Sequence, residues 1–190
     1  MGTAWRTGGH DVTFGVRNPD DPKHAELGSV RTNFAAADTA DVVVLCTPWQ
    51  GTQDAVQSCG DLAGKVVIDA TNPLSPDFST LEVGLSSSGA ELVAGWATGA
   101  RVCKAMNQIG APMMDHPQLD GTPVMFVCGD DDAAKSVTAG LVGELGFETV
   151  DAGELALARL LEPYALLWIH LALRRGLGTG FGFGLLRGQS

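Results

Sequence analysis

Short apolar runs alternate along the chain with segments in which apolar residues recur at helical spacing. Runs rich in β-branched residues predict strands at residues 12–16, 42–46, 66–69, 102–106 and 124–128, and a shorter run predicts one at 30–32. The run VVVLC is apolar without in-and-out alternation, which is typical of a strand buried on both faces. The pattern therefore predicts an α/β fold, a doubly wound and mostly parallel sheet covered by helices.

The helical spacing predicts helices at residues 50–59, 88–98, 132–145 and 154–175. Gly146 is a suitable C-cap for the third of these helices. The last segment is long and carries a broad apolar surface, and we expect Pro163 to start or kink a helix there. Near residues 151–153 the alternation of apolar runs and helical segments gives way to one long segment of helical pattern. This change predicts two parts, a sheet domain at 1–150 and a helical segment with a tail at 151–190.

The tail, GLGTGFGFGLLRGQS, alternates glycine with larger residues. An extended backbone would place one set of side chains on the same side, namely Leu177, Thr179, Phe181, Phe183 and Leu185. A phosphate-binding loop is the alternative, but the tail follows a helix and lacks G-x-G-x-x-G spacing. We therefore expect it to pack against the helical segment.

Composition narrows the class of protein. Hydrophobic residues make up 45% and charged residues 18% of the chain, which is typical of a compact globular protein. The formal net charge of −10 argues against nucleic acid or an anionic membrane as a partner. No apolar run is long enough to cross a bilayer, and the start resembles no signal peptide, so we expect a cytoplasmic protein. The four cysteines form no C-x-x-C pair and are expected to be reduced and buried.

Candidate site residues follow the predicted strands, where ligands bind in a doubly wound sheet. The first strand runs into Arg17 and Asn18. An NAD-binding domain carries an acidic residue at this place, whereas a cation suits the 2′-phosphate of NADP. A solvated loop arginine is the alternative, but the context favours NADP.

The later strand ends carry small polar residues with Pro or Gly, and few charges, as expected of a cofactor cleft. The residues in question are Thr47, Pro48, Trp49, Thr71, Asn72 and Asn107. Trp49 could equally be a core aromatic. No G-x-S-x-G or H-E-x-x-H motif occurs, so we predict neither a catalytic acid or base nor a metal site. The run Asp130–Asp132 is expected to cap a helix.

Several strings, in order, resemble F420-dependent NADP oxidoreductases and their NADP-binding relatives, which include the cytoplasmic domain of membrane metalloreductases. The strings are GHDVTFGVRNP, DVVVLCTPW, KVVIDATNPL, VCKAMNQIGAP, FVCGDDDAAK and DAGELALARLLEP. The resemblance implies a Rossmann-type NADP-binding domain, a C-terminal helical part that completes a homodimer, and hydride transfer between NADP(H) and F420. It implies 2′-phosphate contacts by Arg17 and Asn18, a cleft wall of residues 47–49, and a segment from Asn107 to Ala111 that faces the reacting rings.

The same resemblance implies that the family's first strand and glycine-rich phosphate loop are absent ahead of GTAWRTGGH. That strand is central in the usual strand order, so both of its neighbours are expected to lose ladder partners. A start codon placed too late and a genuine fragment are the two explanations, and the second predicts weak NADP binding.

Three functions remain open at this stage. The first is an NADP-dependent oxidoreductase that passes a hydride to F420 or a flavin-like small-molecule acceptor, since KAMNQIGAP differs from the family's His-containing stretch. The second is a non-catalytic nucleotide-binding or regulatory module. The third is a dehydrogenase of the pyrroline-carboxylate reductase type, for which the helical C-terminal part is short.

Overall fold

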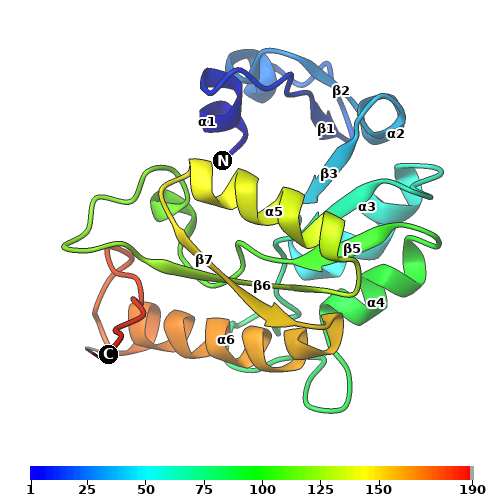
Figure 1. Ribbon diagram of the computed structural model, residues 1–190. Coiled ribbons are helices and arrows are strands. Elements are labelled where there is room, and N and C mark those ends of the chain that lie inside the picture. The colour runs from blue at the N-terminus through cyan, green and yellow to red at the C-terminus, as the bar shows by residue number, and fades with distance from the viewer. Residues whose placement is uncertain (189–190) are drawn as a thin grey trace.

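The computed structural model describes residues 1–188, which form two sheets flanked by helices (Figure 1). The larger sheet has five strands in the order β3-β4-β5-β6-β7, and the smaller has two, β1 and β2. All strand pairs are parallel except β5 with β6. The strands are β1 (Phe14–Val16), β2 (Val30–Thr32), β3 (Val42–Leu45), β4 (Val66–Asp69), β5 (Arg101–Lys104), β6 (Val124–Gly129) and β7 (Glu148–Gly153).

Six α-helices and four short 3-10 helices connect the strands. The α-helices are α1 (Gly2–Thr7), α2 (Asn33–Asp38), α3 (Thr52–Ser58), α4 (Gly89–Trp96), α5 (Asp132–Glu144) and α6 (Ala158–Arg174). The 3-10 helices are η1 (Pro22–Leu27), η2 (Trp49–Gly51), η3 (Ala111–Met113) and η4 (Leu155–Leu157). Side-chain oxygens of Thr32, Ser88 and Asp131 accept the first backbone N–H groups of α2, α4 and α5, as N-caps do.

Successive side chains of each strand enter two cores on opposite faces of the larger sheet. On one face, Val66, Ile68 and Cys103 pack with residues of α1 and α5. On the other face, Val67 and Val102 pack with residues of α3, α4, η4 and α6. Because both faces are covered, the central strands are mostly apolar, and the predicted doubly wound, Rossmann-type α/β fold is confirmed.

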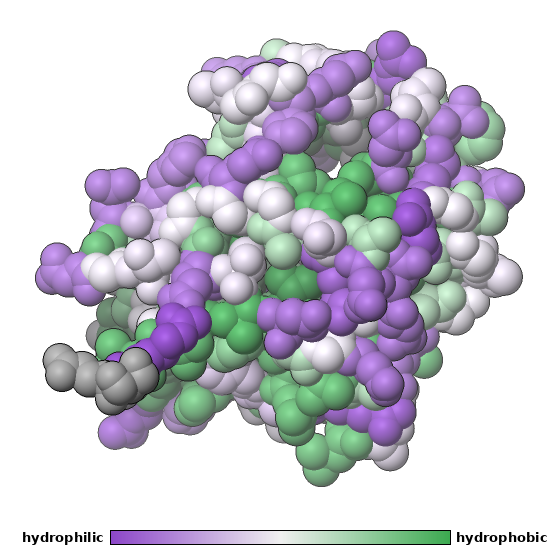
Figure 2. All heavy atoms as spheres, in the orientation of Figure 1, coloured by the Kyte–Doolittle hydropathy of each residue, from purple (hydrophilic) through white to green (hydrophobic). Residues whose placement is uncertain are grey.

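The small sheet is separate from the large one, because β1 pairs only with β2 and β3 only with β4 within residues 1–188. The expected loss of ladder partners at this point is therefore confirmed. Trp5 joins the N-terminal unit to the rest, since it is buried and its Nε1 donates to Leu141 O at 2.8 Å. Figure 2 shows apolar atoms in the hollow between this unit and α5, and Val12, Val42 and Val44 are only partly buried against the core.

The remaining predictions of elements differ from the structure in particular places. Strand β7 and helix α2 were not predicted, because ETVDAG holds no apolar run and NFAAAD has no helical periodicity. Strand β7 continues through Gly153, so the sheet crosses the predicted boundary between the two parts. Pro163 does not start a helix, because α6 runs on both sides of it.

The tail packs against α6 through its two phenylalanines. Phe181 stacks on Trp168 with ring centroids 5.0 Å apart, and Phe183 lies 5.0 Å from Tyr164. Trp168 Nε1 donates to Phe181 O at 3.0 Å, and Val124 N donates to Phe183 O at 2.8 Å. The expected packing is thus confirmed for these residues. The expected one-sided alternation is wrong for Leu177 and Leu185, which are exposed, and positive φ at two glycines turns the backbone before Phe181.

Residues Leu155–Arg174 are long and apolar enough, by length and composition alone, to cross a membrane. One face of this segment is nevertheless buried in the protein, through residues that include Leu161, Ala165 and Trp168. We therefore interpret it as a core helix. The cysteines are all free, and three are buried as expected, whereas Cys46 is exposed. Burial raises the pKa of the Cys128 thiol to about 12.

Gly110 provides a test of the packing between the tail, α6 and the loop after β5. A Cβ atom at this position would lie 2.5 Å from Cη2 of Trp168, whose ring is stacked on Phe181. Gly110→Ala is expected to lower the free energy of unfolding by about 1–3 kcal/mol, as overpacking does. Urea denaturation followed by fluorescence measures this change.

The control is Gly140→Ala in α5, where a Cβ atom meets nothing within 4 Å. There the loss of backbone freedom in the unfolded chain is expected to raise stability by about 0.5–1 kcal/mol. Equal shifts in the two variants would contradict the packing described for Trp168.

Candidate functional site

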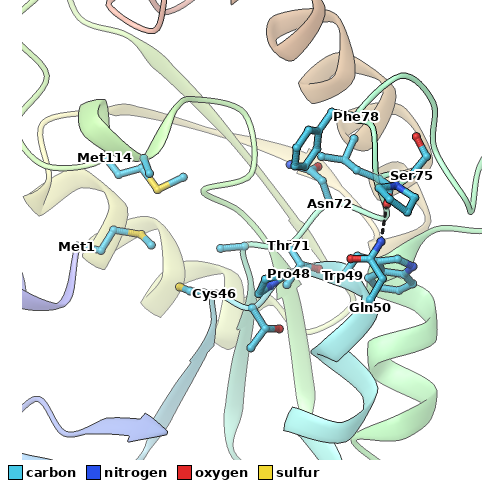
Figure 3. A pocket seen from close by; sticks show the side chains of 15 residues that line it. Met1, Cys46, Pro48, Trp49, Gln50, Thr71, Asn72, Ser75, Phe78 and Met114 are labelled. Atoms are coloured by element: carbon cyan, nitrogen blue, oxygen red, sulfur yellow. Dashed lines mark hydrogen bonds between the residues drawn. The ribbon is translucent and has the colours of Figure 1, made fainter. Parts of the chain in front are cut away.

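A cleft of about 500 Å³ opens at the carboxyl ends of β3 and β4, where doubly wound sheets bind ligands. Figure 3 shows Met1, Cys46 and Met114 at one end of it and Gln50, Asn72 and Phe78 at the other. Its lining is Met1, Cys46, Thr47, Pro48, Trp49, Gln50, Ala70, Thr71, Asn72, Leu74, Ser75, Pro76, Phe78, Ala111 and Met114.

The wall that follows β3 is fixed by a hydroxyl pair. The Oγ1 atoms of Thr47 and Thr52 are 2.9 Å apart, and Thr52 Oγ1 donates to Pro48 O at 3.2 Å. The chain then turns through η2, which places Trp49 in the cleft lining. The Trp49 ring lies against Trp96 of α4, with centroids 5.6 Å apart. Both interpretations of Trp49 made from the sequence therefore apply, because it lines the cleft and also packs against another aromatic ring.

The wall that follows β4 is held by hydrogen bonds to Asp69. Asp69 Oδ1 accepts from Thr71 N at 2.9 Å and from Thr71 Oγ1 at 2.7 Å. Asn72 Nδ2 donates to Asn107 O at 2.9 Å, and Asn107 Nδ2 donates back to Asn72 Oδ1 at 3.0 Å. Asn107 Nδ2 also reaches Leu161 O at 3.2 Å. The turn after β4 is thereby joined to β5 and to α6.

Behind this wall lies a buried group of three charged side chains, Lys104, Asp69 and Glu162. Lys104 Nζ is 2.9 Å from Asp69 Oδ2 and 2.8 Å from Glu162 Oε1, and it donates to Thr71 O at 2.6 Å. All three residues are 0% exposed, so water cannot replace any of these contacts. Burial by itself lowers the pKa of Lys104, but the two carboxylates outweigh it and hold that pKa above its ordinary value.

The sequence does carry a signal for this group, although we did not predict it. Lys104 interrupts the apolar run VCKAM, and Asp69 ends the run VVID. A charged residue inside a doubly buried strand requires a partner of opposite charge. Glu162 could not be assigned as that partner, because pairing between α6 and the sheet is visible only in three dimensions.

The structure places the predicted site residues in the cleft lining, behind the lining, or outside it. Thr47, Pro48, Trp49, Thr71 and Asn72 line the cleft. Asn107 is buried behind it, with its amide turned to Asn72 and Leu161 O.

Arg17 and Asn18 follow β1 and are exposed, outside the lining. A Cβ atom on Gly51, at the end of η2, would lie 3.0 Å from Arg17 Nη2, so the guanidinium lies beside the turn after β3. No carboxylate within residues 1–188 pairs with Arg17.

The chemistry of the cleft is set by uncharged side chains. None of the described lining residues is Asp, Glu, Lys, Arg or His. The acidic run at 130–132 is used in capping, since Asp131 Oδ1 accepts from Ala134 N and Asp130 Oδ1 from Leu155 N. No cluster of His, Cys, Asp or Glu suited to a metal occurs among the described residues. The site can therefore bind and orient flat, weakly polar groups.

The doubly wound sheet, with no charged side chain in the described cleft lining at its strand ends and an arginine beside the cleft, is typical of dinucleotide-binding α/β proteins. The family described as NADP oxidoreductase, coenzyme F420-dependent, matches the chain over residues 1–73. Its F420-dependent NADP reductase from Methanothermobacter thermautotrophicus is 32% identical over 151 residues, which cover 75% of this chain and 65% of the relative. The chain is similar to members of this family over 75% of its length.

Two further comparisons agree. A protein from Arthrobacter sp. FB24 that carries the designation F420-dependent NADP-reductase has a crystal structure with a TM-score of 0.90 to this one. It is 29% identical, and the match covers 98% of this chain and 93% of that one. Metalloreductase STEAP3 of Rattus norvegicus is 28% identical over 160 residues, or 83% of this chain. The match spans about a third of that relative, 32% of its length.

Asn107 tests the link between the cleft and α6. Asn107→Leu keeps the side-chain volume but removes the side-chain amide that bonds Leu161 O, Asn72 Oδ1 and Gln108 Nε2. We expect a loss of about 2–4 kcal/mol in the free energy of unfolding, because buried polar groups lose their hydrogen bonds.

Gln50→Ala is the control for Asn107→Leu, because its one hydrogen bond, to Leu74 O at 3.0 Å, is exposed. It should change stability by less than about 0.5 kcal/mol. A similar small change in both variants, measured by thermal unfolding, would show that the amide pair does not hold the cleft.

Proposed function

We propose that the protein is an NADP-dependent oxidoreductase that transfers a hydride between NADP(H) and F420 or a flavin-like acceptor. The observation that carries this proposal is the uncharged cleft at the carboxyl ends of β3 and β4. Hydride transfer between two stacked rings requires distance and orientation more than an acid or base. A dehydrogenase of alcohols would require a proton-transfer group at the same place.

The residues present fit NADP at the 2′-phosphate end. Arg17 follows the strand that carries the ribose-binding residue in such folds, and its guanidinium is free to form a bidentate contact with a phosphate. Asn18 is beside it, although its Oδ1 already accepts from Asp20 N at 3.3 Å, so only its amide nitrogen is left to donate. These two residues support NADP over NAD as the cofactor.

The lining residues support binding of the rings. Bound NADPH supplies the hydride. The backbone turns after β3 and β4, held by Thr52 and Asp69, orient the lining, and Trp49 offers a flat apolar surface. The sulfur-bearing end of the cleft, with Met1 and Met114, adapts to a large planar acceptor, because methionine side chains are flexible and polarizable.

Arg17→Ala tests the cofactor assignment. In a spectroscopic assay with F420 or FMN as acceptor, the wild type should oxidise NADPH in preference to NADH. The variant is expected to lose about tenfold or more in kcat/KM for NADPH with little change for NADH, because only the 2′-phosphate contact is removed.

Arg31→Ala is the matched control, since Arg31 is an exposed arginine on β2 and shares the same small sheet. It should leave the preference unchanged. A folded wild-type chain that turns over neither acceptor, yet binds NADPH in isothermal titration, would favour a non-catalytic nucleotide-binding module. A chain that does not bind NADPH contradicts the proposal.

We also propose that two copies pair through α6 and that the protein works in the cytoplasm. Leu160 and Leu167, two turns apart on one side of α6, are 62% and 50% exposed, and Leu173 near the end of the helix is 61% exposed. Large apolar side chains exposed on a helix favour a protein partner. The unpaired, mostly buried cysteines suit a reducing compartment.

Sedimentation velocity tests this pairing. Leu167→Glu should convert a dimer into a monomer, because it places a charge in the apolar interface. Val137→Glu on α5, where Val137 is 44% exposed, should leave the dimer intact. A monomeric wild type at micromolar concentration would contradict the pairing.

A further inference from the structure

The buried Lys104 has two sides, and they contact different parts of the molecule. Towards the cleft it meets Asp69 Oδ2 at 2.9 Å and Thr71 O at 2.6 Å. Towards the helices it meets Glu162 Oε1 at 2.8 Å. One ammonium group therefore joins β4, β5 and α6 behind the cleft wall. An ammonium has three donor hydrogens, and these three oxygens account for all of them.

On the cleft side, Asp69 and Lys104 together fix every polar atom of Thr71. The backbone N–H and the hydroxyl of Thr71 both donate to Asp69 Oδ1, at 2.9 and 2.7 Å. Its carbonyl oxygen accepts from Lys104. Thr71 is only 3% exposed, so no water competes for these bonds. The conformation of the turn is therefore set by the ion pair, and the hydroxyl hydrogen is directed into the protein.

On the helix side, Glu162 performs a separate task. Its Oε2 accepts from Gly89 N at 2.9 Å and its Oε1 from Ala90 N at 3.2 Å, which are the first N–H groups of α4. A carboxylate at this end of a helix is favourable both as a cap and against the helix dipole. Glu162 thus ties α6 to α4, and its polar partners are Lys104, Gly89 N and Ala90 N rather than the turn after β4.

The ion group is adjacent to the cleft wall. A Cβ atom on Gly89 would lie 3.1 Å from Glu162 Oε1, 3.1 Å from a ring carbon of Trp49 and 3.3 Å from Pro73 Cδ. The bare backbone of Gly89 is thus packed between the ion group and the walls that follow β3 and β4.

Stability alone does not require such a group. Taking three charges out of water costs several kcal/mol per ion, and well-packed apolar residues often replace a buried pair without loss. What apolar residues cannot do is hold a carbonyl, an N–H and a hydroxyl in fixed directions. The arrangement is therefore suited to orienting the turn that the cleft uses.

We infer that Lys104 and Asp69 act as a positioning pair, which holds the Ala70–Asn72 turn in the shape that receives the nicotinamide cofactor. This inference rests on the proposed function for the identity of the ligand. The pair touches neither the cofactor nor the acceptor, and it acts through Thr71. Glu162 contacts the same ammonium group from the helix side, and its role is to stabilise the fold by joining α6 to α4.

Two matched substitutions separate these roles, because each converts one of the two carboxylates that pair with Lys104 into an amide. Asp69→Asn turns an amide NH2 group towards either Lys104 or Thr71, so the clamp on the turn is lost. Glu162→Gln weakens the cap of α4 and leaves the contacts of Lys104 with Asp69 and Thr71 in place. Thr71→Val is a milder third variant, which removes only the hydroxyl bond to Asp69.

Two quantities are measured for each variant at a temperature where it is folded: the Kd for NADPH, and the hydrogen exchange rate of each backbone amide. Asp69→Asn should raise the Kd and the exchange rate of the Thr71 amide by about tenfold or more, and Thr71→Val by a few-fold. Glu162→Gln should lower the unfolding midpoint and speed exchange at Gly89 and Ala90, while the Kd and the Thr71 amide stay within about twofold of wild type.

A Kd that rises in both carboxylate variants in proportion to their lost stability would overturn the inference, since the group would then be structural only. If Asp69→Asn does not fold, Thr71→Val decides by the same two measurements. If the wild type does not bind NADPH, the proposed function fails. The exchange data still decide the positioning role, because faster exchange at Thr71 in Asp69→Asn but not in Glu162→Gln supports it and equal rates overturn it.

Discussion

Lys104 carries a primary amine with no exposure to solvent, and its three neighbours are two carboxylates and a carbonyl oxygen. An isolated ammonium in this place would lose its proton, because burial favours the neutral form. The partners come from β4, from the turn after it and from α6, elements far apart in sequence. The charge is therefore stable only when sheet, turn and helix are assembled together. The shape of the cleft and the stability of the fold therefore both depend on the neutralisation of the buried Lys104 charge.

The walls of the cleft follow from that arrangement. The turn after β4 is fixed from behind by Asp69 and Lys104, and the turn after β3 is fixed by Thr52. The described lining carries no charged side chain and offers rings, amides, hydroxyls and thioethers. Such a site is suited to a reaction in which orientation matters and no side chain exchanges a proton. The similarity to F420-dependent NADP reductases agrees with this chemistry.

Much of the fold could be predicted from the sequence, because apolar β-branched runs are a direct consequence of strands buried on both faces. The strand at Val66–Asp69 has its predicted bounds, and most other predicted strands differ by a residue or two. Strand β7 escaped prediction because a half-buried edge strand needs no apolar run. The antiparallel pairing of β5 with β6 was hidden as well, since it depends on a long connection whose one helical element is the short η3.

The candidate site could be predicted only in part. Residues at strand ends were found because topology brings such ends together, and five of them line the cleft. Asn107 follows a strand too, but its amide turns inward to Leu161 O, which no local pattern reveals. The ion group was missed for a related reason. Its third member, Glu162, lies on a helix whose contact with the sheet depends on the complete fold.

The protonation of Lys104 tests this account most directly. Nitrogen-15 NMR of the lysine side chains, recorded from neutral to alkaline pH, reports the charge of Nζ and its pKa. The two carboxylates are expected to hold the pKa of Lys104 above that of an ordinary lysine, so Nζ should stay charged beyond the pH at which a free lysine side chain loses its proton. A Lys104 that loses its proton at a lower pH than a free lysine side chain would contradict the account, since the amine would then be buried without effective partners.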